Sequence, residues 1–103
     1  MRPFGGASQE KIVGDRTLTI DKDLIVDNAT EERVEFVGDV EGDEFQFSIS
    51  YRALAEISDE DPFDDAIAAF HSRGAYIASL AAEQAPYAKT YNGDMVDIDI
   101  ERE

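Results

Sequence analysis

The sequence predicts a small α+β domain, and three patterns support this. Two central segments alternate apolar and polar residues with the period of two that half-buried strands require. Residues 61–85 then repeat apolar side chains every three or four positions, as an amphipathic helix does. The last residues alternate again. We therefore expect a small antiparallel sheet, built from a β-hairpin and a C-terminal strand, with two helices packed on one face.

The central hairpin has the clearest pattern. Val34 and Phe36 share one side of the first strand, and Phe45 and Phe47 share one side of the second. Residues 38–43 between them contain two glycines and several acids, which suits a hairpin loop.

The chain before the hairpin is less regular. Residues 1–10 hold Pro3, two glycines and small polar residues without a period, which predicts a flexible N-terminal arm. Short strands are expected at residues 12–13, 17–20 and 24–26. Residues 11–103 are then a single α+β domain, because no linker divides them and their length suits one core.

Two helices are expected after the hairpin. Ser50 can cap a short helix that follows it directly, and Asp61 before Pro62 signals the start of a longer one that Pro86 ends. The apolar stripe of the longer helix comprises Phe63, Ile67, Phe70, Gly74, Ile77 and Ala81. Glycine costs about 1 kcal/mol relative to alanine inside a helix. We expect Gly74 to allow close approach of helix and sheet, or alternatively the crossing of a partner helix.

The final segment predicts a strand over residues 95–101. Its inward side chains are Val96, Ile98 and Ile100, and its outward side chains are Asp97, Asp99 and Glu101. Such a row of carboxylates, about 6–7 Å apart, repels itself and favours a solvated face or a cationic partner. Tyr87 and Tyr91 precede it in a polar connection, where they either pack over the helix end or contact a partner. The candidate contact surface comprises Tyr87, Tyr91, Asp97, Asp99 and Glu101.

The net charge of the chain excludes more function classes than any motif supports. The 103 residues include 24 Asp and Glu against nine Lys and Arg, a formal net charge of −15. Direct nucleic-acid binding requires a basic patch that neutralises phosphates, so we expect none. The acidity fits a solvating surface, in particular in a salty cytoplasm, or a surface that imitates nucleic acid toward a basic protein.

The residues offer no recognisable catalytic constellation. Cysteine is absent, and His71 is the only histidine, so neither a zinc site nor a histidine-activated nucleophile is expected. The acidic loop 59–65 could gather oxygen ligands for calcium or magnesium, although helix capping explains most of its carboxylates. We expect no enzyme and no cofactor. We also expect no membrane span, because no apolar run approaches ~20 residues.

Part of the chain resembles a known family. The resemblance rests on four features: the segment from Arg33 to Phe36, the segment from Phe47 to Leu54, the helix positions Phe70, Ile77 and Ala81, and Gly93 before a closing strand. This pattern, from about Glu32 to Glu101, is similar to the DUF1488 family of small bacterial proteins of unknown function. The resemblance implies a compact α+β fold and a bacterial cytoplasmic setting, and it brings no established activity, cofactor or catalytic residues.

These observations favour a non-catalytic protein-interaction or regulatory module in the cytoplasm, with a protein partner for which the acidity favours a basic surface. A nucleic-acid-mimicking inhibitor of a basic protein is one alternative, and a small divalent-metal-dependent activity using loop 59–65 is another. A homodimer that pairs sheet edges or crosses helices near Gly74 is also open.

Overall fold

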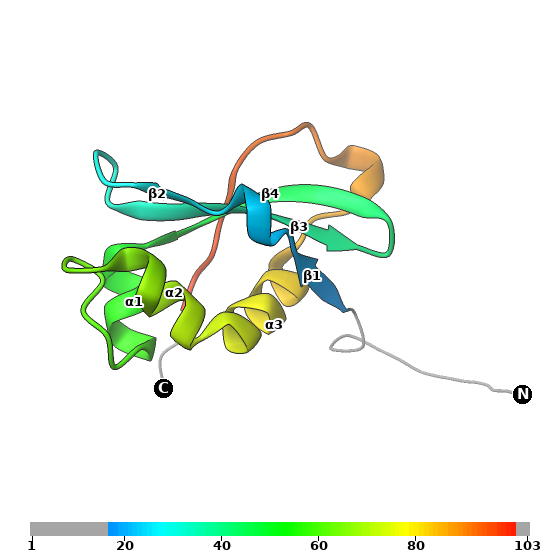
Figure 1. Ribbon diagram of the computed structural model, residues 1–103. Coiled ribbons are helices and arrows are strands. Elements are labelled where there is room, and N and C mark those ends of the chain that lie inside the picture. The colour runs from blue at the N-terminus through cyan, green and yellow to red at the C-terminus, as the bar shows by residue number, and fades with distance from the viewer. Residues whose placement is uncertain (1–16, 101–103) are drawn as a thin grey trace, which may run out of the picture.

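The computed structural model describes residues 17–100, in which a five-stranded sheet carries three α-helices on one face (Figure 1). The strands are β1 (Leu18–Ile20), β2 (Val26–Asn28), β3 (Arg33–Val40), β4 (Asp43–Ser50) and β5 (Val96–Asp97). The helices are α1 (Tyr51–Ile57), α2 (Ala66–Ser72) and α3 (Gly74–Gln84), with 3₁₀ turns η1 (Lys22–Leu24) and η2 (Ala88–Thr90). The predicted α+β class is confirmed.

The sheet is centred on the hairpin of β3 and β4. Its strand order is β1-β3-β4-β5, and β2 pairs with β3 on the same side as β1. The connecting turn is shorter than the predicted loop 38–43, because only Glu41 and Gly42 lie outside the strands. Both have positive φ, 55° and 91°, as a tight two-residue hairpin turn requires.

The last strand differs from the prediction in direction and in length. β5 runs parallel to β4, so the sheet is mixed and not purely antiparallel, and only Val96 and Asp97 pair with it. Between β4 and β5 the chain passes through all three α-helices, which cross the sheet face and return the chain to the end from which β4 starts. Parallel neighbouring strands need such a crossover. The alternation of residues 95–101 predicts a strand but gives no information about its direction.

The core lies between the helices and the sheet face that they cover. The buried side chains of β3 and β4 include the predicted set Val34, Phe36, Phe45, Phe47 and Ile49. Phe36 is the centre of the aromatic cluster, since its ring lies 5.3 Å from that of Phe47 and 5.1 Å from that of Phe70. On the same side Tyr51, the first residue of α1, donates a hydrogen bond to the Asp27 carboxylate and so ties α1 to β2. This bond raises the pKa of Tyr51 to about 12.

The helices begin partly as predicted. Ser50 caps α1, because its hydroxyl accepts a hydrogen bond from the Ala53 N–H at 3.1 Å. The longer helix is broken, which corrects the prediction of a single one. Asp61 only closes a turn, and Asp65 is the residue that caps α2. Arg73 then leaves helical geometry (φ −127°, ψ 27°), and its Nε donates to the Ile57 carbonyl at 2.6 Å, tying the break to the end of α1.

Two stripe positions behave differently from expectation. Phe63 is 60% exposed, because it lies in the turn before α2 and not on a helix. The predicted close approach at Gly74 is wrong, since a Cβ placed there would meet nothing within 4 Å. The close approach lies instead at Gly38, where a Cβ would lie 2.8 Å from both δ-carbons of Leu18, so that this side chain would have to shift.

Some predictions fall outside the described residues. The arm at residues 1–10, the short strand at residues 12–13 and Glu101 all belong to segments whose structure is not described. Within residues 17–100, no helix is long and apolar enough to cross a membrane.

Candidate interaction surface on the open sheet face

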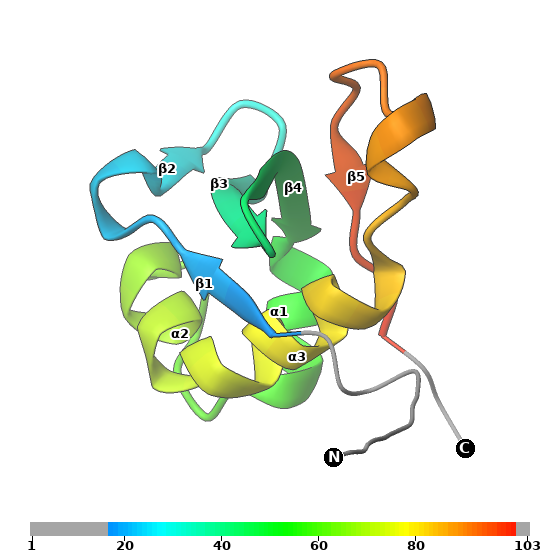
Figure 2. The same cartoon turned by 90° about the vertical axis from the view of Figure 1, so that its right-hand side faces the viewer.

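The second face of the sheet has none of the three α-helices on it. Figure 2 shows β1 and β2 along one side of the sheet, β5 along the other, and α1–α3 below. The strand period of two places polar side chains on this open face wherever their neighbours are buried in the core. Its members include Thr19, Arg33, Glu35, Val37, Asp39, Glu44, Gln46, Ser48 and Asp97.

One end of the open face concentrates negative charge. Asp39 lies directly opposite Glu44 in the β3–β4 register. The two-residue turn makes Val40 and Asp43 a hydrogen-bonded pair, so Asp39 and Glu44 form a non-hydrogen-bonded pair, in which side chains approach most closely. Like charges directly opposed across strands destabilise a sheet. The register therefore places two carboxylates in a repulsive arrangement that a cation would relieve.

These carboxylates border a hollow of about 390 Å³. Its walls are Thr19, Asp21, Val37, Asp39 and Glu44. Val37 is only half-buried and supplies an apolar floor. Two of the carboxylates also serve the backbone, since Asp39 accepts from the Gly42 N–H at 2.9 Å and Asp21 from the Asp23 N–H at 3.0 Å. An apolar floor with acidic walls suits a long cationic side chain, whose stem is apolar and whose head is charged.

At the other end of the open face a carboxylate is paired with a cationic side chain. Arg33 Nε lies 2.8 Å from a carboxylate oxygen of Glu35, and Asn28 donates to the same oxygen at 2.9 Å. The hydrogen bonds from Asn28 and Arg33 lower the pKa of Glu35, and the bond to Glu35 raises the pKa of Arg33. Glu35 is thus held ionised by its neighbours, whereas Asp39 and Glu44 lie opposite each other.

Two members of the predicted acidic row, Asp97 and Asp99, lie in the described part of the chain; both are exposed, and both are held by intramolecular hydrogen bonds. Asp97 accepts a hydrogen bond from the hydroxyl of Ser48, which is buried. The backbone of Asp99 is held twice by Gln84, whose amide donates to its carbonyl and accepts from its N–H, both at 2.8 Å. Asp97 and Asp99 line a second hollow of about 300 Å³ together with Arg33. Part of this predicted surface therefore holds residues 97–99 against β4 and α3.

The two predicted tyrosines separate into different roles. The Tyr91 hydroxyl accepts from the Gln46 N–H at 3.0 Å and donates to the Asp94 carbonyl at 2.7 Å, and its ring packs edge-on against Phe45. Tyr91 thus closes the edge of β4 ahead of β5. Tyr87 is 84% exposed. Within residues 17–100 no hydrogen bond joins Tyr87 to Asp97 or Asp99, and Tyr91 and Asp97 are bonded to different residues of β4.

The acidic loop 59–65 contributes caps and turns. Asp61 accepts from the Phe63 N–H at 2.9 Å, and Asp65 accepts from the Ala68 N–H at 3.0 Å. Among the described residues, no group of three or more Asp, Glu or His side chains is arranged to hold a metal ion. His71 is exposed on the flank of α2, as its position beside Phe70 predicts.

The hollow beside Val37 was not anticipated, although a signal for it exists in the sequence. The assumption of a loop over residues 38–43 removed Asp39 from the strand. With Glu41 and Gly42 taken as a two-residue turn, the register places Asp39 opposite Glu44. Asp21 joins them only through the pairing of β1 with β3, which no short-range pattern encodes.

Comparisons with known proteins add no relative to this description. No family model, no curated protein and no solved structure matches the chain. The resemblance to the DUF1488 family therefore stays a prediction.

Proposed function

We propose that this domain is a non-catalytic interaction module whose open sheet face binds a basic segment of a partner protein in a bacterial cytoplasm. One observation carries the proposal. Asp39 and Glu44 oppose each other beside the half-buried Val37, on a face that none of the α-helices covers. A lysine or arginine of the partner would lay its stem on Val37 and relieve the repulsion between the two carboxylates.

The charge of the whole chain supports the same assignment. A net charge of −15 attracts basic partners over a distance of about 10 Å at 0.1 M salt, and more salt shortens this range. Complementary charge increases the association rate, while the hollow would set where the partner docks. Binding should therefore weaken with salt, as any attraction to an acidic protein does. It should also depend on which carboxylates are removed, as a general attraction to net charge does not.

The test uses a synthetic peptide rich in lysine and arginine as its probe, titrated against the full chain by fluorescence anisotropy. The double variant Asp39→Asn and Glu44→Gln keeps the shape of both side chains and the acceptor oxygen for Gly42. It should weaken binding about tenfold, equivalent to about 1.4 kcal/mol. It should also unfold at the same or a slightly higher denaturant concentration, because a like-charge pair is removed.

The matched control is the double variant Asp59→Asn and Glu60→Gln, which removes two charges from the exposed loop before α2. It should change the affinity less than about threefold, as expected for charges whose only effect is long-range. An equal loss of affinity in both double variants would show that the peptide senses net charge alone and would overturn the proposal of a localised site.

A further inference from the structure

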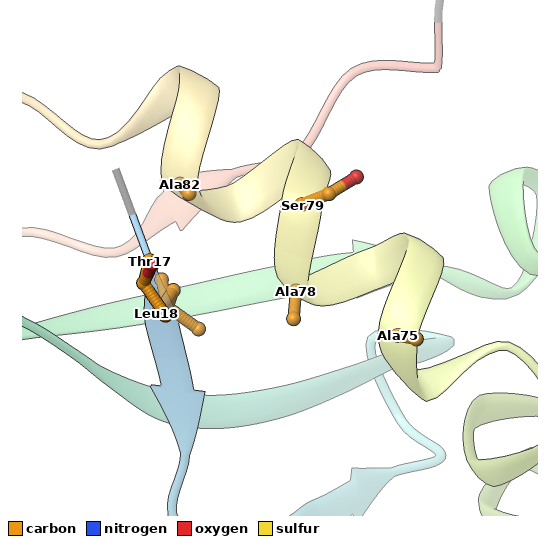
Figure 3. Close-up of a pocket in the computed structure, with 6 residues that line it drawn as sticks. All are labelled: Thr17, Leu18, Ala75, Ala78, Ser79 and Ala82. Carbon is orange, nitrogen blue, oxygen red and sulfur yellow. The ribbon is translucent and has the colours of Figure 1, made fainter. Parts of the chain in front are cut away.

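A groove runs between the edge strand β1 and helix α3. Figure 3 shows one part of it, a hollow of about 210 Å³ between Leu18 of β1 and the small side chains of α3. This part is lined by Thr17, Leu18, Ala75, Ala78, Ser79 and Ala82. A second hollow of about 470 Å³ shares Leu18, Ala75 and Ala78 and extends the groove past Ile20. The two hollows therefore form one mostly apolar depression along β1.

The groove differs in charge from other hollows of the molecule. No Asp or Glu lines either part, and Lys22 and His71 are its ionisable residues. Each of three other hollows has at least two carboxylates in its wall. Two copies of a chain with a net charge of −15 repel each other over most orientations. A second copy therefore meets less local repulsion over this groove than over those three hollows.

The edge of β1 has hydrogen-bonding groups available for another strand. The Asp21 N–H bonds to the Val37 carbonyl at 2.9 Å, so the hydrogen-bonded pairs of β1 and β3 are Asp21 with Val37 and Thr19 with Asp39. The N–H and C=O groups of Leu18 and Ile20 alternate with these and point away from β3. Among the described residues, neither backbone donates or accepts a further hydrogen bond on that side.

We propose that this edge binds a second copy of the chain, with the two β1 strands antiparallel about a two-fold axis at Thr19. Leu18 then faces the partner's Ile20 as a hydrogen-bonded pair, and the symmetry repeats this pair. The Leu18 and Ile20 side chains lie on the helix side of the sheet. Leu18 is buried in the core of its own copy, so the half-buried Ile20 is the side chain that each copy brings toward Ala75 and Ala78 of the other. An isologous contact of this kind closes on itself as a dimer.

The position of Thr19 provides a specific test. Its side chain is exposed, and in the proposed dimer it meets its own copy at a non-hydrogen-bonded pair with Cα atoms about 4.5 Å apart. That separation lies within the range that a disulfide spans. The chain has no cysteine, so a single introduced thiol reports one contact. Thr19→Cys should form a covalent dimer under mild oxidation, at least about tenfold faster than the exposed turn variant Thr30→Cys.

Sedimentation equilibrium supplies the second measurement. The wild-type chain should show a dimer whose association strengthens with added salt, because salt screens the repulsion between the copies. The salt dependence of dimerisation is thus opposite to that of binding the basic peptide. A failure of one proposal can therefore be told from a failure of the other. Ala75→Glu places a carboxylate in the groove and should abolish the dimer, whereas Ala88→Glu on the exposed turn η2 should leave it unchanged.

Three results would overturn the proposal. One is a monomer at every concentration and salt, including the case in which another part of the chain fills the groove. Another is a dimer that Ala75→Glu leaves intact, since the copies would then meet elsewhere. The third is equal oxidation rates for the Thr19 and Thr30 cysteine variants.

Discussion

The two faces of the same sheet differ in burial and in chemistry. On the covered face, Phe36 and Phe47 are at most 2% exposed and stack on each other. On the open face, their neighbours Val37 and Gln46 remain in contact with solvent, beside Asp39 and Glu44. Core residues and residues of the proposed binding face thus alternate along the same strands. A change on one face should affect folding, and a change on the other should affect binding.

The largest expected effect is the removal of a ring from the covered face. Phe36→Ala should lower the free energy of unfolding by about 3–5 kcal/mol, because it removes buried apolar surface and leaves a cavity. Val37→Ala, one residue along β3 and on the open face, should cost less than about 1 kcal/mol. Urea unfolding monitored by circular dichroism measures both.

The milder variant Phe36→Leu keeps the measurement possible in case Phe36→Ala does not fold. Similar losses for Phe36→Leu and Val37→Ala would contradict the division between the faces.

An intermediate effect is expected where β1 joins the sheet. Gly38→Ala places a methyl group against the δ-carbons of Leu18 and should cost about 1–2 kcal/mol through overpacking. Because the displaced Leu18 belongs to β1, hydrogen exchange should accelerate at the Asp21 amide before it does so in β4. Gly42 is an unsuitable control, since its positive φ adds strain of another kind. Uniform acceleration throughout the sheet would argue against a local effect at β1.

The smallest effect is the pH dependence of stability at the end of the open face where Arg33 pairs with Glu35. The pKa of Glu35 is lowered in the folded chain by Asn28 and Arg33, so its ionised form stabilises the fold above the ordinary value of 4.5. This stabilisation is lost as the pH falls through the lowered pKa. Glu35→Gln should therefore lower stability at pH 7 and converge with the wild type at strongly acidic pH, as denaturant titrations across that range would show. A difference that persists at the acidic end would assign the effect to packing.

Much of the fold could be predicted from short-range patterns. The alternation of Phe45 and Phe47 identified the buried side of β4, and Ser50 identified the start of α1, because both signals act through neighbours in the chain. The break at Arg73 could not be predicted. The apolar period continues across it, and the side chain at the break is bonded to the carbonyl of Ile57, sixteen residues earlier.

The candidate site divides in the same way. Asp97 and Asp99 were identified because alternation alone places them outward, but their partners Ser48 and Gln84 come from distant elements. Tyr87 and Tyr91 looked equivalent in the sequence. Only the position of the Gln46 N–H at the edge of β4 makes Tyr91 a structural residue and leaves Tyr87 exposed.

Local patterns in the sequence were enough to assign which residues share a side of β3, β4 and β5 and where α1 begins, and the composition gives the strong negative charge. The direction of β5, the hollow beside Val37 and the position of the β1 edge next to α3 follow only from the three-dimensional fold. The physical reason is the range of the interactions. Alternation and capping act over a few residues, whereas strand pairing and the crossover of three helices depend on contacts between segments far apart in the chain.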